Sequence, residues 1–159
     1  MPNINNLKKY NKIYMIGIGG ISMSGIAEIL ANWGFSVSGS NNVDSEILHT
    51  LENAGIKVHI GHNAQNVVGA DCVVYTAAIH PDNPELVHAK ELGIPTIERS
   101  DFLGELTRCY KNTIAISGTH GKTTTTSLVS LCFLEALRDP SIQVGAIIKE
   151  IDGNYRVGN

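Results

Sequence analysis

The sequence predicts an α/β fold, in which a parallel β-sheet has helices on both faces. Short segments rich in Val and Ile alternate along the chain with segments that have the apolar spacing of helices. Glycine follows most of the helical segments, where it can end a helix in a left-handed conformation. Parallel strands need a crossover connection, which is usually a helix, so this alternation indicates a parallel sheet.

The first part of the chain contains five expected strands and the helices between them. We expect strands over 12–18, 35–40, 56–60, 70–78 and 94–98, with helices over 20–33, 44–55, 84–93 and 100–108. The first helix places Ile21, Ile26, Ile29, Leu30 and Trp33 on one face, which predicts its buried side. This unit is complete by about residue 107.

A second α/β unit begins after the polar segment 108–112. We expect a strand over 113–117, a glycine-rich loop, a helix over 124–138 and another strand over 142–151. The unit has then barely begun, so the sequence predicts one domain over 1–107 and the truncated start of another over 108–159.

Composition excludes several classes of function. The formal net charge is −3 and the pI is about 6.0, so no basic excess indicates nucleic-acid binding. No Lys/Arg block suggests a membrane surface, and no apolar run approaches the length of a membrane span. Cys72, Cys109 and Cys132 lack the spacing of a redox or metal motif, which favours buried thiols in a reducing, cytoplasmic compartment.

The first glycine-rich segment, GIGGISMSG over 17–25, lies where the first strand meets the first helix. Gly17 and Gly19 fit the start of the dinucleotide fingerprint G-x-G-x-x-G, and such loops bind phosphates through backbone N–H groups at a helix N-terminus. Ser22 replaces the third glycine, and Asn41 stands where an acid would hold a ribose. The pattern favours a Rossmann-like phosphate site, and a tight structural turn is the alternative.

The second glycine-rich segment, ISGTHGKTTTT over 116–126, resembles a P-loop in which the first glycine lies closer to the Gly-Lys-Thr end than in the standard pattern. Gly121, Lys122 and Thr123 fit the end of G-x-x-x-x-G-K-[ST], but Ile116 occupies the position of the first glycine. Lys122 could reach the β- and γ-phosphates of ATP, the Thr123 hydroxyl could ligate Mg²⁺, and the N–H groups from Thr119 onward could hold phosphate oxygens. The alternative is a helix start whose lysine is merely solvated.

The second loop resembles the ATP loop of the Mur ligases, whose pattern is G-T-x-G-K-[ST]. The segments IGIGGISMSGIAEIL, SGSN, IGH, TAAIHPDNPEL and IPTIERSDFL are similar, in the same order, to those of the family member that joins L-alanine to UDP-N-acetylmuramic acid. The resemblance covers essentially the whole chain. It implies a cytoplasmic enzyme of peptidoglycan synthesis with three domains, which bind the UDP-sugar, ATP with Mg²⁺, and the amino acid.

The resemblance also implies a reaction and a set of site residues. ATP would phosphorylate the lactyl carboxylate of UDP-N-acetylmuramic acid, and the amine of L-alanine would attack the acyl phosphate. Lys122 would be catalytic and Thr123 would ligate Mg²⁺. The UDP-sugar would lie against Gly17, Ile18, Gly19, Gly20, Ser40, Asn41, His62, Thr76, Ala77 and Arg99, and ATP against Gly118, Thr119, His120, Gly121, Lys122, Thr123 and Thr124.

Several alternatives stay open from the sequence. The murein-tripeptide recycling ligase of the same family shares GTHGKTTT, a nicotinamide-dependent oxidoreductase would use Gly17 and Gly19, and a non-enzymatic nucleotide-binding regulator would suit the short chain. His59 and His62 have H-x-x-H spacing, but no second ligand pair follows for zinc. The acidic magnesium ligand of the family would come after Asn159, so we expect that this chain alone does not ligate.

Overall fold

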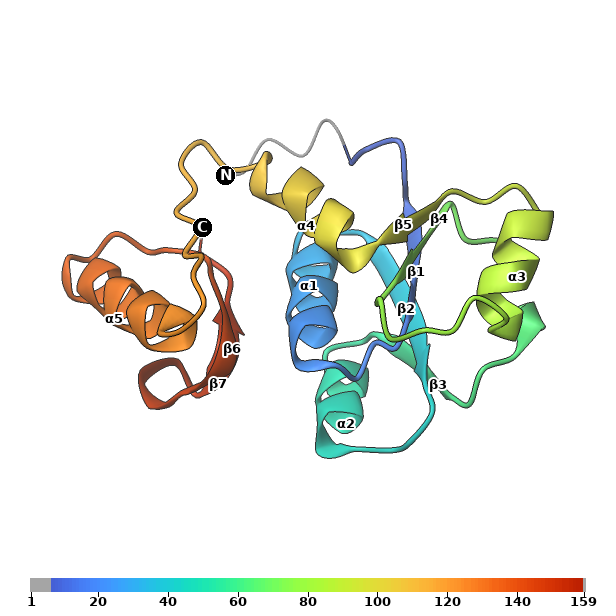
Figure 1. The fold of residues 1–159 in the computed structure, drawn as a ribbon, viewed down its shortest axis with the longest axis horizontal. Helices are drawn as coiled ribbons and strands as arrows, with labels where there is room; N and C mark the ends of the chain where they lie inside the picture. Colours follow the sequence, from blue (N-terminus) through green and yellow to red (C-terminus); the bar gives the residue numbers. More distant parts are fainter. Residues whose placement is uncertain (1–6, 159) are drawn as a thin grey trace.

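A five-stranded parallel sheet forms the centre of the first unit in the computed structural model, which describes residues 7–158 (Figure 1). The strand order is β3-β2-β1-β4-β5. The strands are β1 (Lys12–Ile16), β2 (Ser36–Asn41), β3 (Lys57–Ile60), β4 (Cys72–Tyr75) and β5 (Thr96–Glu98). The predicted α/β fold with a parallel sheet is therefore confirmed.

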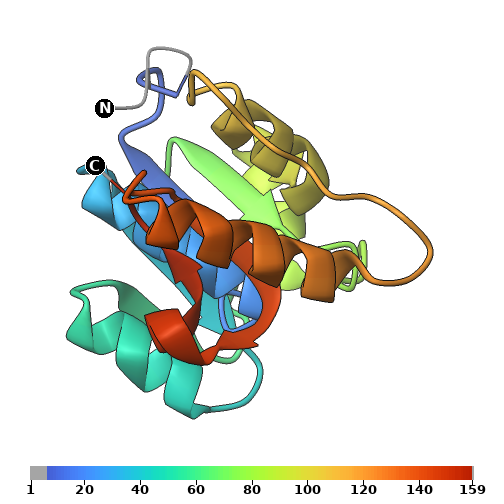
Figure 2. The same ribbon diagram turned by 90° about the vertical axis from the view of Figure 1, so that its left-hand side faces the viewer.

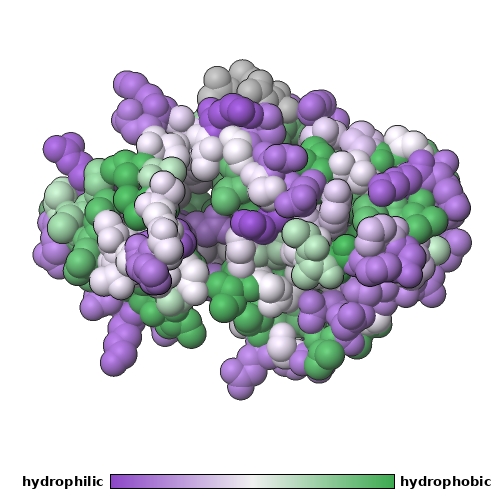
Figure 3. Space-filling model, in the orientation of Figure 1, coloured by the Kyte–Doolittle hydropathy of each residue, from purple (hydrophilic) through white to green (hydrophobic). Residues whose placement is uncertain are grey.

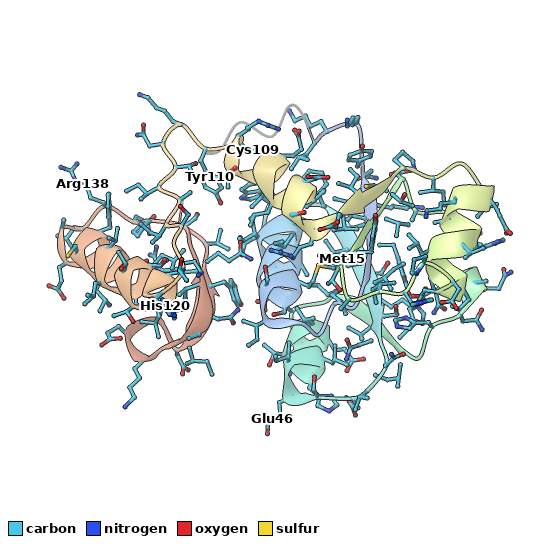
Figure 4. All side chains as sticks on the ribbon, viewed as in Figure 1. Met15, Glu46, Cys109, Tyr110, His120 and Arg138 are labelled. Carbon is cyan, nitrogen blue, oxygen red and sulfur yellow. The ribbon has the colours of Figure 1, made fainter. Side chains whose placement is uncertain are left out.

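Helices cover both faces of this sheet (Figure 1). The helices α1 (Ile21–Asn32), α2 (Glu46–Asn53) and α4 (Arg99–Thr107) pack on one face, where they bury Ile13 and Met15 of β1. The helix α3 (Pro84–Glu91) and the 3₁₀ turn η1 (Ala64–Val67) cover the other face, where Tyr14 and Ile16 are buried. Successive side chains of a strand point to opposite faces, so the central strand is apolar throughout. Met15 lies in the middle of the molecule (Figure 4).

Helix α1 is buried on more than one side, unlike the single stripe that its sequence suggests. Ile26, Ile29 and Leu30 are buried as expected, but Met23 and Ala27 are buried as well. Ile21 is 48% exposed, so its place in the predicted apolar face was wrong. Ile21 is the first residue of α1 and lies beyond the carboxyl end of β1, where fewer core side chains surround it.

The second unit consists of α5 (Lys122–Glu135) packed on a two-stranded antiparallel sheet. The strands are β6 (Ile142–Ile148), which the sequence predicted, and β7 (Gly153–Arg156), which it did not; the 3₁₀ turn η2 (Lys149–Ile151) joins them. Ile142, Val144 and Ile148 form a small core against Leu131 and Leu134 of α5.

The strand expected over 113–117 is absent, which corrects the prediction. Residues 113–117 belong to no strand, and Ile114 is 60% exposed. A strand is held by hydrogen bonds to a neighbour, and β6 and β7 pair with each other. The segment instead runs outward before it returns to α5 (Figure 2).

The β6–β7 hairpin contacts α1, and it thereby joins the second unit to the first (Figure 1). The Gln143 amide donates to the Ser22 carbonyl oxygen at 2.9 Å, and the Asn154 amide donates to the Ile21 carbonyl oxygen at 2.7 Å. The Tyr155 hydroxyl donates to the Glu28 carboxylate. In residues 7–158 we find no helix long and apolar enough to cross a membrane.

Candidate nucleotide site

The first glycine-rich loop lies at the point where the strand order of the sheet reverses. From β1 the chain moves outward to β2 and β3, then crosses back to β4 on the other side of β1. Loops that leave adjacent strands in opposite directions open a crevice at the carboxyl ends of those strands, and ligands of open α/β sheets bind there. Residues 17–20 directly follow β1 at this switch point.

Internal hydrogen bonds fix the loop and leave only some of its N–H groups for a ligand. Gly17 has φ of +80°, which a residue with a side chain rarely adopts. The N–H groups of Gly17 and Ile18 donate to the Ser40 carbonyl oxygen at 2.8 and 3.0 Å, and the Gly20 N–H donates to the Gly17 carbonyl oxygen at 3.2 Å. The donors that remain are at Gly19 and in the first turn of α1, where N–H groups have no intrahelical acceptor and Gly20 gives no side-chain cap.

Several predicted UDP-sugar residues gather around this loop. A Cβ placed on Gly19 would lie 2.9 Å from Asn41 Cγ, so the Asn41 side chain lies directly against Gly19. A Cβ placed on Gly17 would lie 3.6 Å from Thr76 Cγ2. The Arg99 guanidinium, at the start of α4, reaches the Ser22 hydroxyl at 3.4 Å. Ser22, which replaces the third glycine of the fingerprint, therefore brings a cation to the N-terminus of α1.

Three other predicted UDP-sugar residues differ in exposure: one is exposed to solvent and two are largely buried. Ala77 is exposed beyond the end of β4. Ser40 is fully buried, and the His62 side chain is 11% exposed. The Ser40 hydroxyl and His62 Nδ1 lie 2.9 Å apart, and both contact the Glu85 carboxylate.

Sequence reasoning did not single out Glu85 as part of the site. Its carboxylate is fully buried and also accepts a hydrogen bond from the Tyr14 hydroxyl at 2.7 Å. Burial raises the pKa of the Tyr14 hydroxyl far above its ordinary value, so this hydroxyl stays a donor. An acid at the second position of a helix, two residues after the capping Asn83, reads from sequence as an ordinary helix start, and this explains why it was missed.

The second glycine-rich loop is exposed along its whole length. Residues Gly118 to Thr124 are all exposed, and His120 lies in the loop that leads into α5 (Figure 4). Gly121 caps α5 in the left-handed conformation with φ of +77°. The Lys122 ammonium folds back and donates to the carbonyl oxygens of Gly118 and Thr119, the latter at 3.2 Å. In this arrangement the carbonyl oxygens of the loop bind the cation, so the lysine would have to turn outward to contact a phosphate.

The chain itself supplies few ligands for a metal ion at this loop. Thr123 is exposed in the first turn of α5, so its hydroxyl can serve as a Mg²⁺ ligand. Within residues 7–158 no group of three or more His, Cys, Asp or Glu side chains could hold a metal ion. Mg²⁺ is commonly held by one or two protein groups together with phosphates and waters, so Thr123 fits a nucleotide-bound ion.

A hollow of about 440 Å³ lies between α5 and η2, at the end of α5 opposite to the loop. Its lining includes Leu131, Leu134 and Leu137. Apolar residues also reach the surface of this unit, which is seen at the left of the space-filling view (Figure 3). Arg156 also lines this hollow, but its guanidinium already donates to Asp139 and to the Pro140 carbonyl oxygen, and Glu135 and Glu150 beside it would repel a phosphate. The candidate nucleotide sites are therefore the two loops.

Comparisons with known proteins place the chain among ligases. Residues 12–111 match the description "Mur ligase family, catalytic domain". The UDP-N-acetylmuramate–L-alanine ligase of Acetivibrio thermocellus is 54% identical over 151 residues, which are 95% of this chain and 32% of that protein. The crystal structure of the UDP-N-acetylmuramate-alanine ligase from Thermotoga maritima aligns with a TM-score of 0.86 at 37% identity, over 93% of this chain and 35% of that one.

A second solved structure is equally similar in fold. The UDP-N-acetylmuramate:L-alanyl-gamma-D-glutamyl-meso-diaminopimelate ligase from Neisseria meningitides aligns with a TM-score of 0.86 at 29% identity, over 92% of this chain and 46% of that one. The chain spans about a third of the length of the curated relatives that it matches.

Proposed function

Because the chain belongs to the Mur ligase family, we propose that it serves the ATP-dependent joining of L-alanine to UDP-N-acetylmuramic acid in cytoplasmic peptidoglycan synthesis. The observation that carries this proposal is the loop over 17–20 at the switch point of the sheet, with Asn41 and Arg99 beside it. In this proposal, residues 1–107 bind the UDP-sugar and residues 108–159 begin the ATP-binding domain.

The diphosphate would lie at the N-terminus of α1. The positive end of the helix, the N–H groups of its first turn and the Arg99 guanidinium all favour an anion there. Gly17, Ile18 and Gly20 would shape the loop, because their N–H groups already have acceptors. The Gly19 N–H would be the loop donor, and no side chain at that position separates it from the ligand.

The uridine would lie at the ends of β2 and β4. Asn41 offers an amide for a hydroxyl or a base edge, and it carries no charge that would repel a phosphate. His62 would contact the ligand from the β2 side, with the buried Ser40 beside it, and Thr76 and Ala77 would line the site from the β4 side. Each of these residues lies at or just beyond the carboxyl end of a strand.

At the second loop, ATP would phosphorylate the lactyl carboxylate. This step is needed because a carboxylate is a poor electrophile until one of its oxygens has become part of a phosphate leaving group. The amine of L-alanine would then attack the carbonyl carbon and release phosphate, which leaves an amide and ADP. Lys122 would stabilise the charge on the transferred phosphoryl group, and Thr123 would hold Mg²⁺, which neutralises the same charge. Gly118, Thr119, His120, Gly121 and Thr124 would surround the phosphates.

A second candidate function is ligation of a murein tripeptide by the same kind of chain. The structure from Neisseria meningitides supports it, since its TM-score equals that of the alanine ligase structure. Identity favours the alanine ligase, at 37% against 29%. Both relatives are named for UDP-N-acetylmuramate, so the proposed UDP-sugar site is common to the two candidates.

Calorimetric titration of this chain with UDP-N-acetylmuramic acid, ATP and NADH tests the proposal. We expect saturable binding of the UDP-sugar and no binding of NADH. Binding of NADH without binding of the UDP-sugar would overturn the proposal in favour of an oxidoreductase. A phosphate-release assay with UDP-N-acetylmuramic acid, ATP, Mg²⁺ and L-alanine should show no turnover by this chain alone, and measurable turnover would refute that part of the proposal.

A further inference from the structure

Glu85 is a fully buried carboxylate with an unusually large set of hydrogen-bond donors. One oxygen, Oε2, contacts the Ser40 hydroxyl at 2.5 Å and His62 Nδ1 at 2.8 Å. The other oxygen, Oε1, accepts from the Tyr14 hydroxyl at 2.7 Å, the Asn66 amide at 2.8 Å and the Asn63 N–H at 3.3 Å.

These contacts suit an ionised carboxylate. A buried charge is costly unless hydrogen bonds replace the lost water, and every neighbour of Glu85 can act as a donor. The second position of α3 adds the positive end of a helix dipole. A neutral carboxyl group could give its proton to only one of these neighbours, and it would be a weaker acceptor for the other donors.

The Glu85 carboxylate is connected to the candidate nucleotide site through Ser40. The Ser40 hydroxyl donates to Glu85 Oε2, and the Ser40 carbonyl oxygen accepts the N–H groups of Gly17 and Ile18. One residue of β2 therefore links the buried carboxylate to the glycine-rich loop.

The same carboxylate also determines which ring nitrogen of His62 carries the proton. Ser40 gives its hydroxyl hydrogen to Glu85, so a lone pair of Ser40 Oγ and a carboxylate oxygen both face His62 Nδ1. Two acceptors at Nδ1 require a hydrogen on Nδ1. In the neutral imidazole, Nε2 is then left as an acceptor, and it contacts no other polar group among residues 7–158.

We propose that Glu85 is a positioning residue of the UDP-sugar site, which holds His62 in the Nδ1–H form so that Nε2 accepts a hydrogen bond from the nucleoside. This inference rests on the proposed function for the identity of the ligand. The matching group on the ligand is a donor, either a ribose hydroxyl or the imide N–H of uracil. Glu85 itself stays buried behind Ser40 and His62 and does not touch the ligand.

The first test reads the His62 ring without any ligand. Long-range ¹H–¹⁵N spectra of the chain labelled with ¹⁵N-histidine distinguish the two neutral tautomers, and a His62→Gln variant identifies the His62 signals. We expect the Nδ1–H form in the unaltered chain. Glu85→Gln removes the charge, so the Nδ1–H population should fall, whereas Glu91→Gln, an exposed carboxylate on the same helix, should leave it unchanged.

The second test measures affinity for UDP-N-acetylmuramic acid by calorimetry. Glu85→Gln should weaken binding by up to roughly tenfold, because the nucleoside would lose its hydrogen bond to the neutral His62 Nε2. In a His62→Ala background the same change should have little further effect, because Glu85 acts through His62. Additive losses would overturn the proposal, as would unchanged affinity of Glu85→Gln.

The two tests separate this inference from the proposed function. If the unaltered chain does not bind the UDP-sugar, the proposed function fails, while the ring spectrum still shows whether Glu85 controls His62. An Nε2–H form in the unaltered chain overturns the inference even if Glu85→Gln does not fold.

Discussion

The first glycine-rich loop is supported by a sheet on both sides, whereas the second is supported by its own helix alone. The loop over 17–20 donates two N–H groups to β2 and lies against Asn41 and Thr76. The loop over 118–124 is exposed throughout, follows a segment without strand partners, and its lysine bonds to its own carbonyl oxygens. Both have the glycines of a phosphate site, but only the first has surroundings that fix its geometry.

A glycine motif in the sequence is therefore not enough to form a binding site of fixed geometry. Glycines permit a loop to approach a phosphate, while neighbouring strands decide whether the loop has one conformation in the absence of ligand. We therefore expect changes around the first loop to alter both the stability of the fold and the affinity for the UDP-sugar. Changes in the second loop should alter ATP affinity alone.

The largest expected effect is from Gly39→Ala in β2. The new methyl group would lie 2.9 Å from Ile18 Cβ and closer still to the Met15 carbonyl oxygen, in a buried part of the sheet. We expect a loss of about 3 kcal/mol in the free energy of unfolding, as for an overpacked core. Urea denaturation measures it, with Gly104→Ala as the control, because nothing lies within 4 Å of a Cβ there. Equal stability of the two variants would show that the sheet around the first loop is not rigid.

The next effect is from Gly19→Ala at the diphosphate loop. The added methyl group would meet the Asn41 side chain at 2.9 Å and would displace it from the ligand. We expect UDP-sugar affinity to fall at least about tenfold, equivalent to about 1.4 kcal/mol. The control is Gly20→Ala, where the nearest atom to a Cβ, the Gly17 carbonyl oxygen, lies at an ordinary 3.5 Å. If calorimetry gives the same loss for both variants, Asn41 is not the cause.

Lys122→Met addresses the second loop directly. Removal of the ammonium group should weaken ATP binding by roughly tenfold, since a charge-assisted contact to phosphate is lost. UDP-sugar affinity should not change, because the Lys122 contacts are confined to Gly118 and Thr119. Titrations with both ligands check this, and Lys149→Met in η2 serves as a control for lost surface charge. A change in UDP-sugar affinity would mean that the two loops are coupled.

The smallest effect concerns the contact between α1 and the β6–β7 hairpin. Burial raises the pKa of Glu28 from 4.5 to about 7. Because the pKa of Glu28 is higher in the folded state, its contribution to the free energy of unfolding is fully present below about pH 4.5. This contribution is lost as the pH rises through about 7. Since Glu28 is only half buried, we expect a loss of about 1 kcal/mol or less between pH 5 and 8. The Tyr155 ring signals in NMR spectra report the contact.

Glu28→Gln provides the control for this pH dependence. The amide does not titrate, so its Tyr155 signals and its stability should vary less between pH 5 and 8 than those of the unaltered chain. The same pH dependence in both proteins would assign the effect to another group.

Local patterns predicted the strands of the first sheet, although β1 and β4 are far apart in the sequence, and they missed β7, which pairs with the adjacent β6. The strands of the first sheet and the loop after β1 were predictable, because apolar runs, glycines and helix stripes are all local signals. The strand expected over 113–117 was wrong, since a strand depends on a neighbour that its own residues do not specify. Glu85 was missed for the same reason: only the fold brings it next to Ser40 and His62.

The most direct measurement of the central claim is a pair of calorimetric titrations on the same chain, one with UDP-N-acetylmuramic acid and one with ATP and Mg²⁺. We expect the UDP-sugar to bind at a single saturable site and more tightly than ATP, because only the first loop is fixed in place by its surroundings. Binding of ATP at least as tight as that of the UDP-sugar would contradict this expectation.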